Sequence, residues 1–372
     1  MRMVAPLWSR RDLLRLSGVG AGALCLGGLL AACGAPSASP AAPTSAPAPT
    51  QAAAAKPAAT QAAPAAPATQ PPAAKPAAPK LLVSYGSPVG SFAALWMAKA
   101  INAFEKYGVQ VDVQLVETAT AIPGLIANSI EAAEVSAAPV LTADVNGNQD
   151  LVLIASALNH PILGLYAGAD ITTADTLKGK TIASDKPGTP VDYSARLSLS
   201  LLGLKPEDVD LRAIGNSTEI VAAMLSGQVQ AGMVAPPQSF QVEGKGFHLL
   251  QDIFSQPYQN VGLVAKRSRL DELAPALRPL LAAYRDGIQA WNTQPDLAMQ
   301  VQDEYAKVGD PEVLRKTYEF YTKTAPFESS MQPTMEGIKA MMDFLAASVP
   351  AMKDHKPEDF VDTRFLSNLP TA

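Results

Sequence analysis

Small polar and aromatic residues follow several short apolar stretches of this 372-residue sequence, where they could bind an oxygen-bearing or ring-shaped molecule. The candidates are Tyr85, Gly86, Ser87, Ser91, Phe92, Ser136, Ala137, Ala138, His160, Gly188, Thr189, Asn216 and Pro236. Backbone N–H groups at the start of a helix suit an anionic or carbonyl oxygen, and Tyr85 or Phe92 could stack on a ring.

Each candidate also has a structural alternative. The serines and Asn216 could serve only as helix N-caps and turn residues, because their side chains accept hydrogen bonds from the first helical N–H groups. A lone histidine such as His160 is often a structural hydrogen-bonding residue, and Trp96 fits the apolar face of a helix. The candidate loops contain no arginine before Arg196, and Lys186 is the nearest cation. An anionic ligand would therefore depend on N–H groups, and a neutral or aromatic ligand remains open.

The sequence lacks the short motifs of several enzyme classes. It contains no H-E-x-x-H, G-x-S-x-G or Walker-A pattern, and its three histidines are His160, His248 and His355. The formal net charge of −5 comes without a basic stripe, which argues against nucleic-acid binding. We therefore expect no catalytic residue, no metal and no cofactor.

The elements that must position the candidates alternate between strand and helix. Strands are expected at 81–86, 109–116, 133–137, 151–158, 162–168, 181–184, 209–214, 231–235 and 260–268, and helices at 91–108, 122–130, 191–202, 218–226 and 237–244, at a segment beginning near 140, and in most of the chain from 270 onward. This alternation predicts an α/β fold of two lobes, each with a central sheet flanked by helices. Ligands of such sheets bind at the carboxyl ends of the strands.

Three segments, in the right order and spacing, carry a family resemblance. They read FEKYGVQVDVQLV, ITTADTLKGKTIASDKPGT and LLGLKPEDVDLRAIGNSTEIVAAMLSGQVQAGMVAPPQS. Over roughly residues 80–268 the chain resembles the periplasmic substrate-binding proteins of ABC importers of the nitrate/sulfonate/taurine type. Gln230 stands where that family often has an acidic residue, which weakens assignment to a named substrate subgroup.

The resemblance implies capture of a small solute between two hinged lobes and its delivery to an ABC permease with its ATPase. Lobe one would comprise residues 80–178 and 270–372, and lobe two residues 179–262, with 263–269 as the returning crossover. The solute could be a sulfonate-, nitrate- or taurine-like anion or a small heterocycle or aromatic. The protein is expected to act as a monomer.

The first 79 residues resemble an export signal followed by a tether. Arg10 and Arg11 precede an apolar run that ends at Cys33, a layout similar to a twin-arginine lipoprotein signal over residues 1–32. General secretion remains the alternative for a basic segment of this kind. Residues 33–79 consist mostly of Ala and Pro and cannot form a core, which predicts a disordered tether. We expect lipidation of Cys33 and anchoring on the outer side of the cytoplasmic membrane.

Two rival functions remain open at this stage. The same fold family includes enzymes of thiamine-pyrimidine synthesis, so a related ligand binder or enzyme is one alternative. A lipoprotein that senses a ligand without meeting a transporter is the other. Bound pyridoxal phosphate or turnover would indicate the enzyme, and adjacent permease and ATPase genes would indicate transport.

Overall fold

The computed structural model describes residues 80–147 and 150–371. The expected signal segment, Cys33 and the Ala/Pro-rich tether lie outside the described residues. Within the described ranges, no helix combines the length and apolar character that a membrane span requires.

The first sheet has five strands in the order β2-β1-β3-β10-β4. Their bounds are β1 Lys80–Tyr85, β2 Gln110–Leu115, β3 Ala132–Ser136, β4 Leu151–Leu158 and β10 Val261–Lys266. β1 pairs in parallel with β2 and β3, so that Tyr85 lies opposite Leu115 on one side and Glu134 on the other. β10 runs antiparallel to β3 and β4. Three parallel strands therefore direct their carboxyl ends to one edge of this sheet.

The second sheet repeats this layout in the order β7-β6-β8-β5-β9. Its strands are β5 Gly164–Gly168, β6 Thr181–Ser184, β7 Asp210–Ala213, β8 Ala231–Val234 and β9 Phe247–Gln251. β6 pairs in parallel with β7 and β8, and β5 runs antiparallel to β8 and β9.

The lobe boundaries differ from those expected from the sequence. β5 belongs to the second sheet, so lobe two begins before residue 178, and β10 completes the first sheet instead of forming a crossover. The physical reason is that β5 and β10 are short, buried apolar strands that would fit either sheet. Only the pairing reveals which sheet each strand joins.

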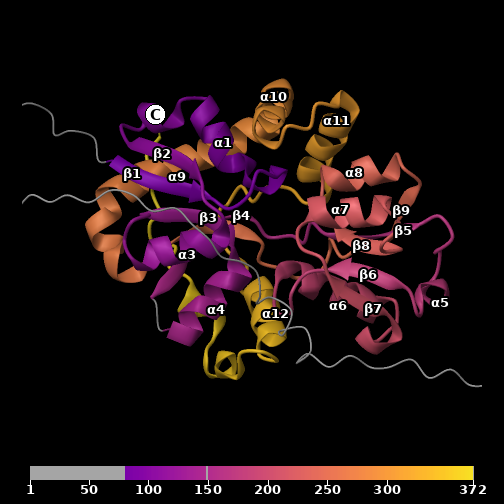
Figure 1. Cartoon of the computed structure of the whole chain (residues 1–372). Helices are drawn as coiled ribbons and strands as arrows, with labels where there is room; N and C mark the ends of the chain where they lie inside the picture. The colour runs from indigo at the N-terminus through magenta and orange to yellow at the C-terminus, as the bar shows by residue number, and fades with distance from the viewer. Residues whose placement is uncertain (1–79, 148–149, 372) are drawn as a thin grey trace, which may run out of the picture. The chain divides into compact units, whose positions relative to one another are not determined.

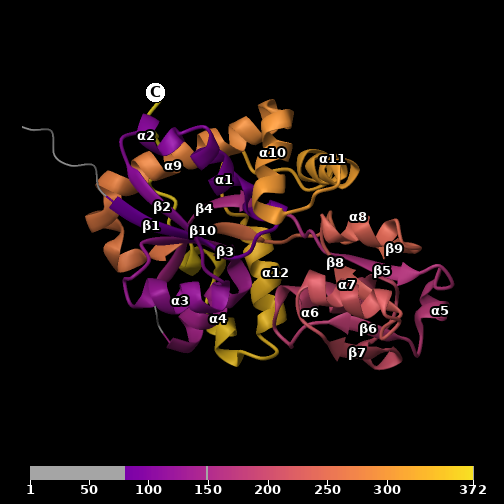
Figure 2. The same cartoon turned by 45° about the horizontal axis from the view of Figure 1, so that its top comes forward.

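Helices cover both faces of the first sheet (Figures 1 and 2). One face packs against α1 Ala93–Ala100, α2 Ala103–Lys106 and the long α9 Leu270–Thr293 in one buried apolar cluster. The other face packs against α3 Thr118–Ile126, α4 Ala137–Gly147 and α12 Met335–Leu345. The single helix expected over 91–108 is interrupted at Asn102, whose φ of 53° is left-handed, and it begins as a 3₁₀ turn, Gly90–Phe92.

The second sheet is also sandwiched between helices. α6 Pro190–Leu201 covers one face, where Ala195 and Leu199 join the apolar cluster of that side. α7 Ser217–Leu225 and α8 Gln238–Glu243 cover the other face through Ile220, Met224 and Val242. The short α5 Ala174–Leu177 lies between β5 and β6.

Two further helices extend from the end of α9 toward the second lobe (Figure 1). α10 Pro295–Ala306 contacts α1 and α9, and α11 Pro311–Glu319 contacts both α10 and α8. α11 continues into a π-helical segment, Phe320–Thr324, where Phe320 meets Phe254 edge to face at 5.0 Å between ring centroids.

Candidate functional site

Two chain segments connect the two sheets. Residues 159–163 join β4 to β5, and residues 252–260 join β9 to β10. Asn260 links the two segments, because its backbone N–H donates to the Leu158 carbonyl at 3.1 Å and its side-chain amide donates to the His160 carbonyl at 2.8 Å. The lobes are therefore joined by a paired connection of the kind that permits hinge motion.

A cleft of about 670 Å³ lies between the lobes, beside this connection. Its lining includes residues that follow parallel strands of both sheets, such as Gly86 after β1, Glu117 after β2, Asp185 after β6 and Asn216 after β7. The carboxyl ends of the parallel strands thus face a shared space, the position at which α/β sheets bind ligands.

Six of the candidate residues from the sequence line this cleft: Gly86, Ser87, Ser91, Phe92, Ser136 and Asn216. They come from the segment after β1, the end of β3 and the segment after β7. Asn216 also caps α7, because its side-chain oxygen accepts hydrogen bonds from the N–H groups of Thr218 at 2.9 Å and Glu219 at 3.3 Å. Asn216 is therefore both the N-cap of α7 and a lining residue of the cleft.

Tyr85 belongs to the core and not to the cleft lining. Its ring lies edge to face with Trp96 at 5.5 Å and with Tyr305 at 5.9 Å between centroids, and only 8% of the residue is exposed. Trp96 is fully buried and stacks on Tyr305, as expected for a residue on the apolar helix face. Phe92 is thus the aromatic candidate that reaches the cleft.

Gly188 and Thr189 form the turn that starts α6 and do not line the cleft. Thr189 is the N-cap: its hydroxyl accepts from the Asp192 N–H at 3.3 Å and donates to the Lys186 carbonyl at 2.9 Å. Gly188 has a φ of +85°, and its N–H donates to the Asp192 carboxylate at 3.0 Å. The N–H and hydroxyl groups that the sequence offers to a ligand here are used within the turn.

The remaining candidates lie behind or beside the cleft. Ala137 and Ala138 are buried at the start of α4, and the Ala137 N–H donates to the Asn260 carbonyl at 3.0 Å. His160 lies in the first connecting segment, where its carbonyl accepts from Asn260, and Pro236 is buried between two lining residues, Ala235 and Gln238.

The cleft also contains residues that the sequence reasoning did not select. Glu117 and Asp185 are its charged lining residues within the described part of the chain, and Tyr258, Asn260 and Gln238 add polar groups. Burial raises the pKa of Tyr258, and the neighbouring Tyr193 raises it further, so this phenol stays neutral. Glu117 comes two residues after a strand, as Ser87 does, and the same rule could have found it.

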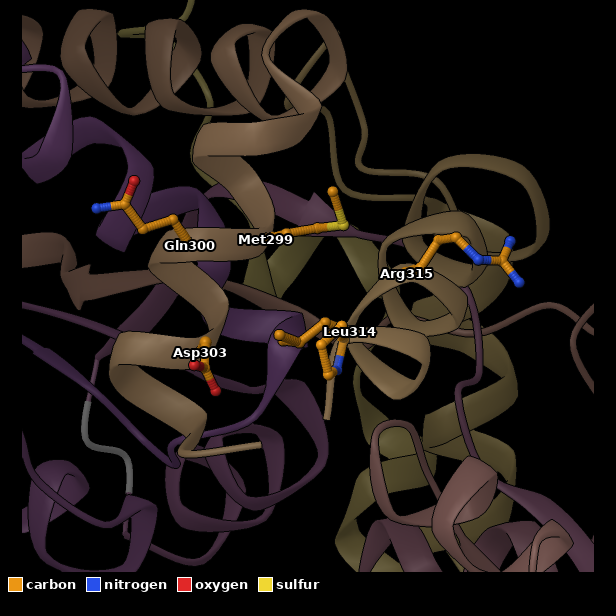
Figure 3. Close-up of a pocket in the computed structure, with 6 residues that line it drawn as sticks. Met299, Gln300, Asp303, Leu314 and Arg315 are labelled. Carbon is orange, nitrogen blue, oxygen red and sulfur yellow. The ribbon is translucent and has the colours of Figure 1, made fainter. Parts of the chain in front are cut away.

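A smaller hollow of about 360 Å³ lies between α10 and α11, away from the ends of the strands (Figure 3). Met299, Gln300 and Asp303 come from α10, and Leu314 and Arg315 come from α11. The guanidinium of Arg315 points away from α10 and pairs with Glu312 on its own helix at 2.7 Å. The larger cleft, to which both lobes contribute, is therefore the candidate functional site.

The comparison with known families decides the membership of this chain. A family model described as NMT1/THI5 like matches residues 90–298, more than half of the sequence. The chain belongs to the NMT1/THI5-like family. A search of curated protein sequences gives no match. The family resemblance expected from the sequence is confirmed.

Solved structures similar to this family member share its fold. The periplasmic aliphatic sulphonate binding protein SsuA from Escherichia coli aligns with a TM-score of 0.63 and 18% identity over 76% of this chain and 98% of its own. The alkanesulfonate-binding protein SsuA from Xanthomonas axonopodis pv. citri, bound to MOPS, gives 0.58 and 19% over 75% and 96%. The desulfurization enzyme DSZB gives 0.61 and 14% over 77% and 98%. The expected periplasmic-binding-protein-like fold is confirmed.

Proposed function

We propose that this NMT1/THI5-like protein is the extracytoplasmic solute-binding component of an ABC importer. It captures a small solute between its lobes and delivers it to a permease and its ATPase. The observation that carries the proposal is the 670 Å³ cleft, to which the carboxyl ends of strands from both sheets contribute. Closing two lobes on a solute removes it from water on all sides and creates a surface that a permease can recognise.

Binding is favoured over catalysis by the residues of the cleft. Among the described lining residues there are hydroxyls, amides and two carboxylates, but no cysteine, histidine or lysine. Those three side chains supply many of the nucleophiles and general bases of enzymes. The fold alone does not separate the two roles, since a desulfurization enzyme shares it.

The proposal extends to location. A lipid on Cys33 and a tether over residues 33–79 would keep a monomeric receptor at the outer face of the membrane, close to its permease. Radiolabelled fatty acid incorporated by the wild type but not by Cys33→Ser tests this part. A sensor of the same fold would lack adjacent permease and ATPase genes.

Thermal unfolding of the purified full-length chain with a library of small metabolites tests solute binding. A solute at 100 times its Kd adds about 2.7 kcal/mol to the stability of the folded state. We expect Ser87→Ala to weaken binding of that solute with little change in apo stability, because Ser87 lines the cleft.

Thr189→Ala is the matched control for Ser87→Ala. Loss of its N-cap lowers stability by about 0.5–2 kcal/mol and should leave affinity unchanged. Failure of every library member to raise the melting temperature contradicts solute binding. Equal effects of the two substitutions on affinity would contradict the assignment of Ser87 to the site.

A further inference from the structure

The charge of the cleft restricts the solute that it can hold. Glu117, at the start of α3, comes from lobe one, and Asp185, after β6, comes from lobe two. No lysine, arginine or histidine is found among the described lining residues. Lys186 is exposed and does not line the cleft, and Arg196 pairs with the buried Asp192 at 2.8 Å. A bound anion would face two carboxylates without a balancing cation.

The helix starts of lobe two are poor substitutes for that cation. Around the start of α6, the N–H of Lys186 donates to Asp185 at 2.7 Å, and the N–H of Gly188 donates to Asp192. At the start of α7, the Glu219 carboxylate accepts from the Asn216 N–H at 3.0 Å. Anion binding at a helix start relies on free N–H groups, and at the starts of α6 and α7 the Thr189 hydroxyl and the Asn216 side chain already accept from the N–H groups of Asp192, Thr218 and Glu219.

The start of α3 in lobe one is also unsuited to an anion. No side chain caps this helix, and its N-cap residue is the exposed, acidic Glu117. A negative group there interacts favourably with the helix dipole and repels a second negative group. The α3 helix start therefore favours a ligand that donates hydrogen bonds to Glu117.

The other lining residues suit an apolar molecule that carries a hydrogen-bond donor. The buried side-chain oxygen of Gln238 has no hydrogen-bond partner within the part of the chain that the structure describes. An acceptor left unpaired in a buried position is costly, and a ligand N–H would satisfy it. Phe92, Ile162, Leu163 and Val191 supply apolar contacts in the same cleft.

We propose that the cleft binds a small organic solute with amino or amidino donors and without net negative charge. Its nitrogen groups donate to Glu117 and Asp185, and its carbon skeleton packs on the apolar lining. This inference rests on the proposed solute-binding function and separates the chain from the sulfonate binders whose fold it shares.

The test compares solutes of opposite charge on one carbon skeleton by calorimetry on the full-length chain. Benzamidine against benzoate, and agmatine against a dicarboxylate of similar length, are the probe pairs, together with every hit from the metabolite library. We expect donor-bearing solutes without negative charge to bind at least tenfold more tightly than their anionic counterparts.

Substitution of the two carboxylates completes the test. Glu117→Gln combined with Asp185→Asn should weaken the best solute at least tenfold, because both carboxylates become neutral amides of the same shape. Glu105→Gln combined with Glu207→Gln is the control, since it removes the same charge from exposed positions outside the cleft. It should leave affinity unchanged.

The outcomes separate the inference from the proposed function. Binding of anionic solutes, or binding that the cleft double variant leaves intact, overturns the inference and preserves the solute-binding function. Absence of any bound solute overturns the proposed function and the inference with it.

Discussion

Glu134 is a carboxyl group in the interior of the first lobe. It lies on β3 with no exposed surface, and the hydroxyl of Tyr284 on α9 donates to one of its oxygens. Its other oxygen has no hydrogen-bond partner within the described residues. Burial raises the pKa of Glu134 well above its ordinary value, and the hydrogen bond from Tyr284 opposes this only in part. The group therefore keeps its proton in the folded state at a pH where the unfolded chain has lost it.

The stability of the protein should consequently fall as the pH rises. A group whose pKa is higher in the folded than in the unfolded state contributes its full stabilisation at pH values below the unfolded pKa. This contribution is lost as the pH rises toward the folded pKa. Above the ordinary glutamate pKa of 4.5, each pH unit lowers the stability by about 1.4 kcal/mol while the folded carboxyl stays protonated. We expect Glu134→Gln to remove this slope, measured by urea unfolding between pH 4.5 and 8.

Glu105→Gln is the control for Glu134, because Glu105 is exposed on α2. It should leave the slope as in the wild type. Parallel pH profiles for Glu134→Gln and the wild type would show that Glu134 ionises normally, against the direction expected from its burial.

Single residues of the cleft were predictable where they lie at the carboxyl end of a parallel strand. Ser87 and Asn216 follow parallel strands and Ser136 ends one, and hydrophobic patterning is enough to find the ends of such strands. Asn260 precedes β10, which runs antiparallel, so its place in the cleft depends on a pairing that the local sequence does not encode. Thr189 also comes after a parallel strand but does not line the cleft. Its hydroxyl instead bonds to the Asp192 N–H and the Lys186 carbonyl within the turn.

At the scale of elements, the contact between α1 and α9 depends on one glycine. Gly287 of α9 lies so close to α1 that a Cβ atom there would be 2.3 Å from the Ala94 carbonyl oxygen and 2.7 Å from the Ala98 nitrogen. Both neighbours are backbone atoms, which cannot move away by changing rotamer. The glycine thus sets the spacing of the helices that cover one face of the first sheet.

Gly287→Ala should therefore destabilise the protein although alanine favours helices. Alanine gains about 1 kcal/mol of helix propensity, but separating two packed helices costs more, and we expect a net loss of about 1–3 kcal/mol in urea unfolding. Gly244→Ala is the control, since a Cβ atom there would be 3.7 Å from the Gln241 carbonyl oxygen, an ordinary contact distance. A Gly287→Ala variant as stable as the control would contradict this close approach.

The elements themselves were predictable to different degrees. β1, β4 and β6 are short apolar runs, and their expected bounds agree with the structure to within about one residue. β9 was not expected, because the sequence FHLLQ is partly exposed at a sheet edge and lacks a clear alternation of apolar and polar residues. Local patterning finds strands of the sheet interior and misses strands that are defined mainly by their partner.

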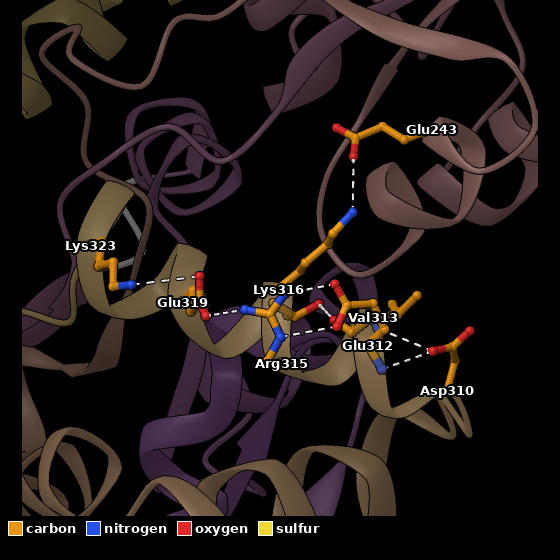
Figure 4. Close-up of polar contacts among 9 residues, drawn as sticks. Glu243, Asp310, Glu312, Val313, Arg315, Lys316, Glu319 and Lys323 are labelled. Carbon is orange, nitrogen blue, oxygen red and sulfur yellow. Dashed lines mark hydrogen bonds and ion pairs between the residues drawn. The ribbon is translucent and has the colours of Figure 1, made fainter.

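For the whole molecule, an ion pair joins the two lobes at a distance from the connecting segments. Lys316 on α11 lies 3.8 Å from the carboxylate of Glu243 on α8 (Figure 4). Its ammonium is 5.8 Å from the centre of the Phe240 ring. α11 packs on α10, which in turn packs on α1 and α9 of lobe one. The pair therefore bridges the lobes and responds to their separation.

Reversing one charge of this pair should weaken solute binding, because it disfavours the approach of the two lobes. Lys316→Glu places two carboxylates side by side, which disfavours the arrangement in which α8 and α11 are close. Both side chains are more than 30% exposed, so the effect is limited to about 1 kcal/mol, or about fivefold in affinity. Lys316→Glu combined with Glu243→Lys should restore affinity, and 0.5 M salt should shrink every difference because screening weakens exposed pairs.

Lys323→Glu is the matched control, since Lys323 pairs with Glu319 on its own segment at 3.5 Å and spans no lobe boundary. A double reversal that binds no better than Lys316→Glu alone would mean that this pair does not couple the lobes.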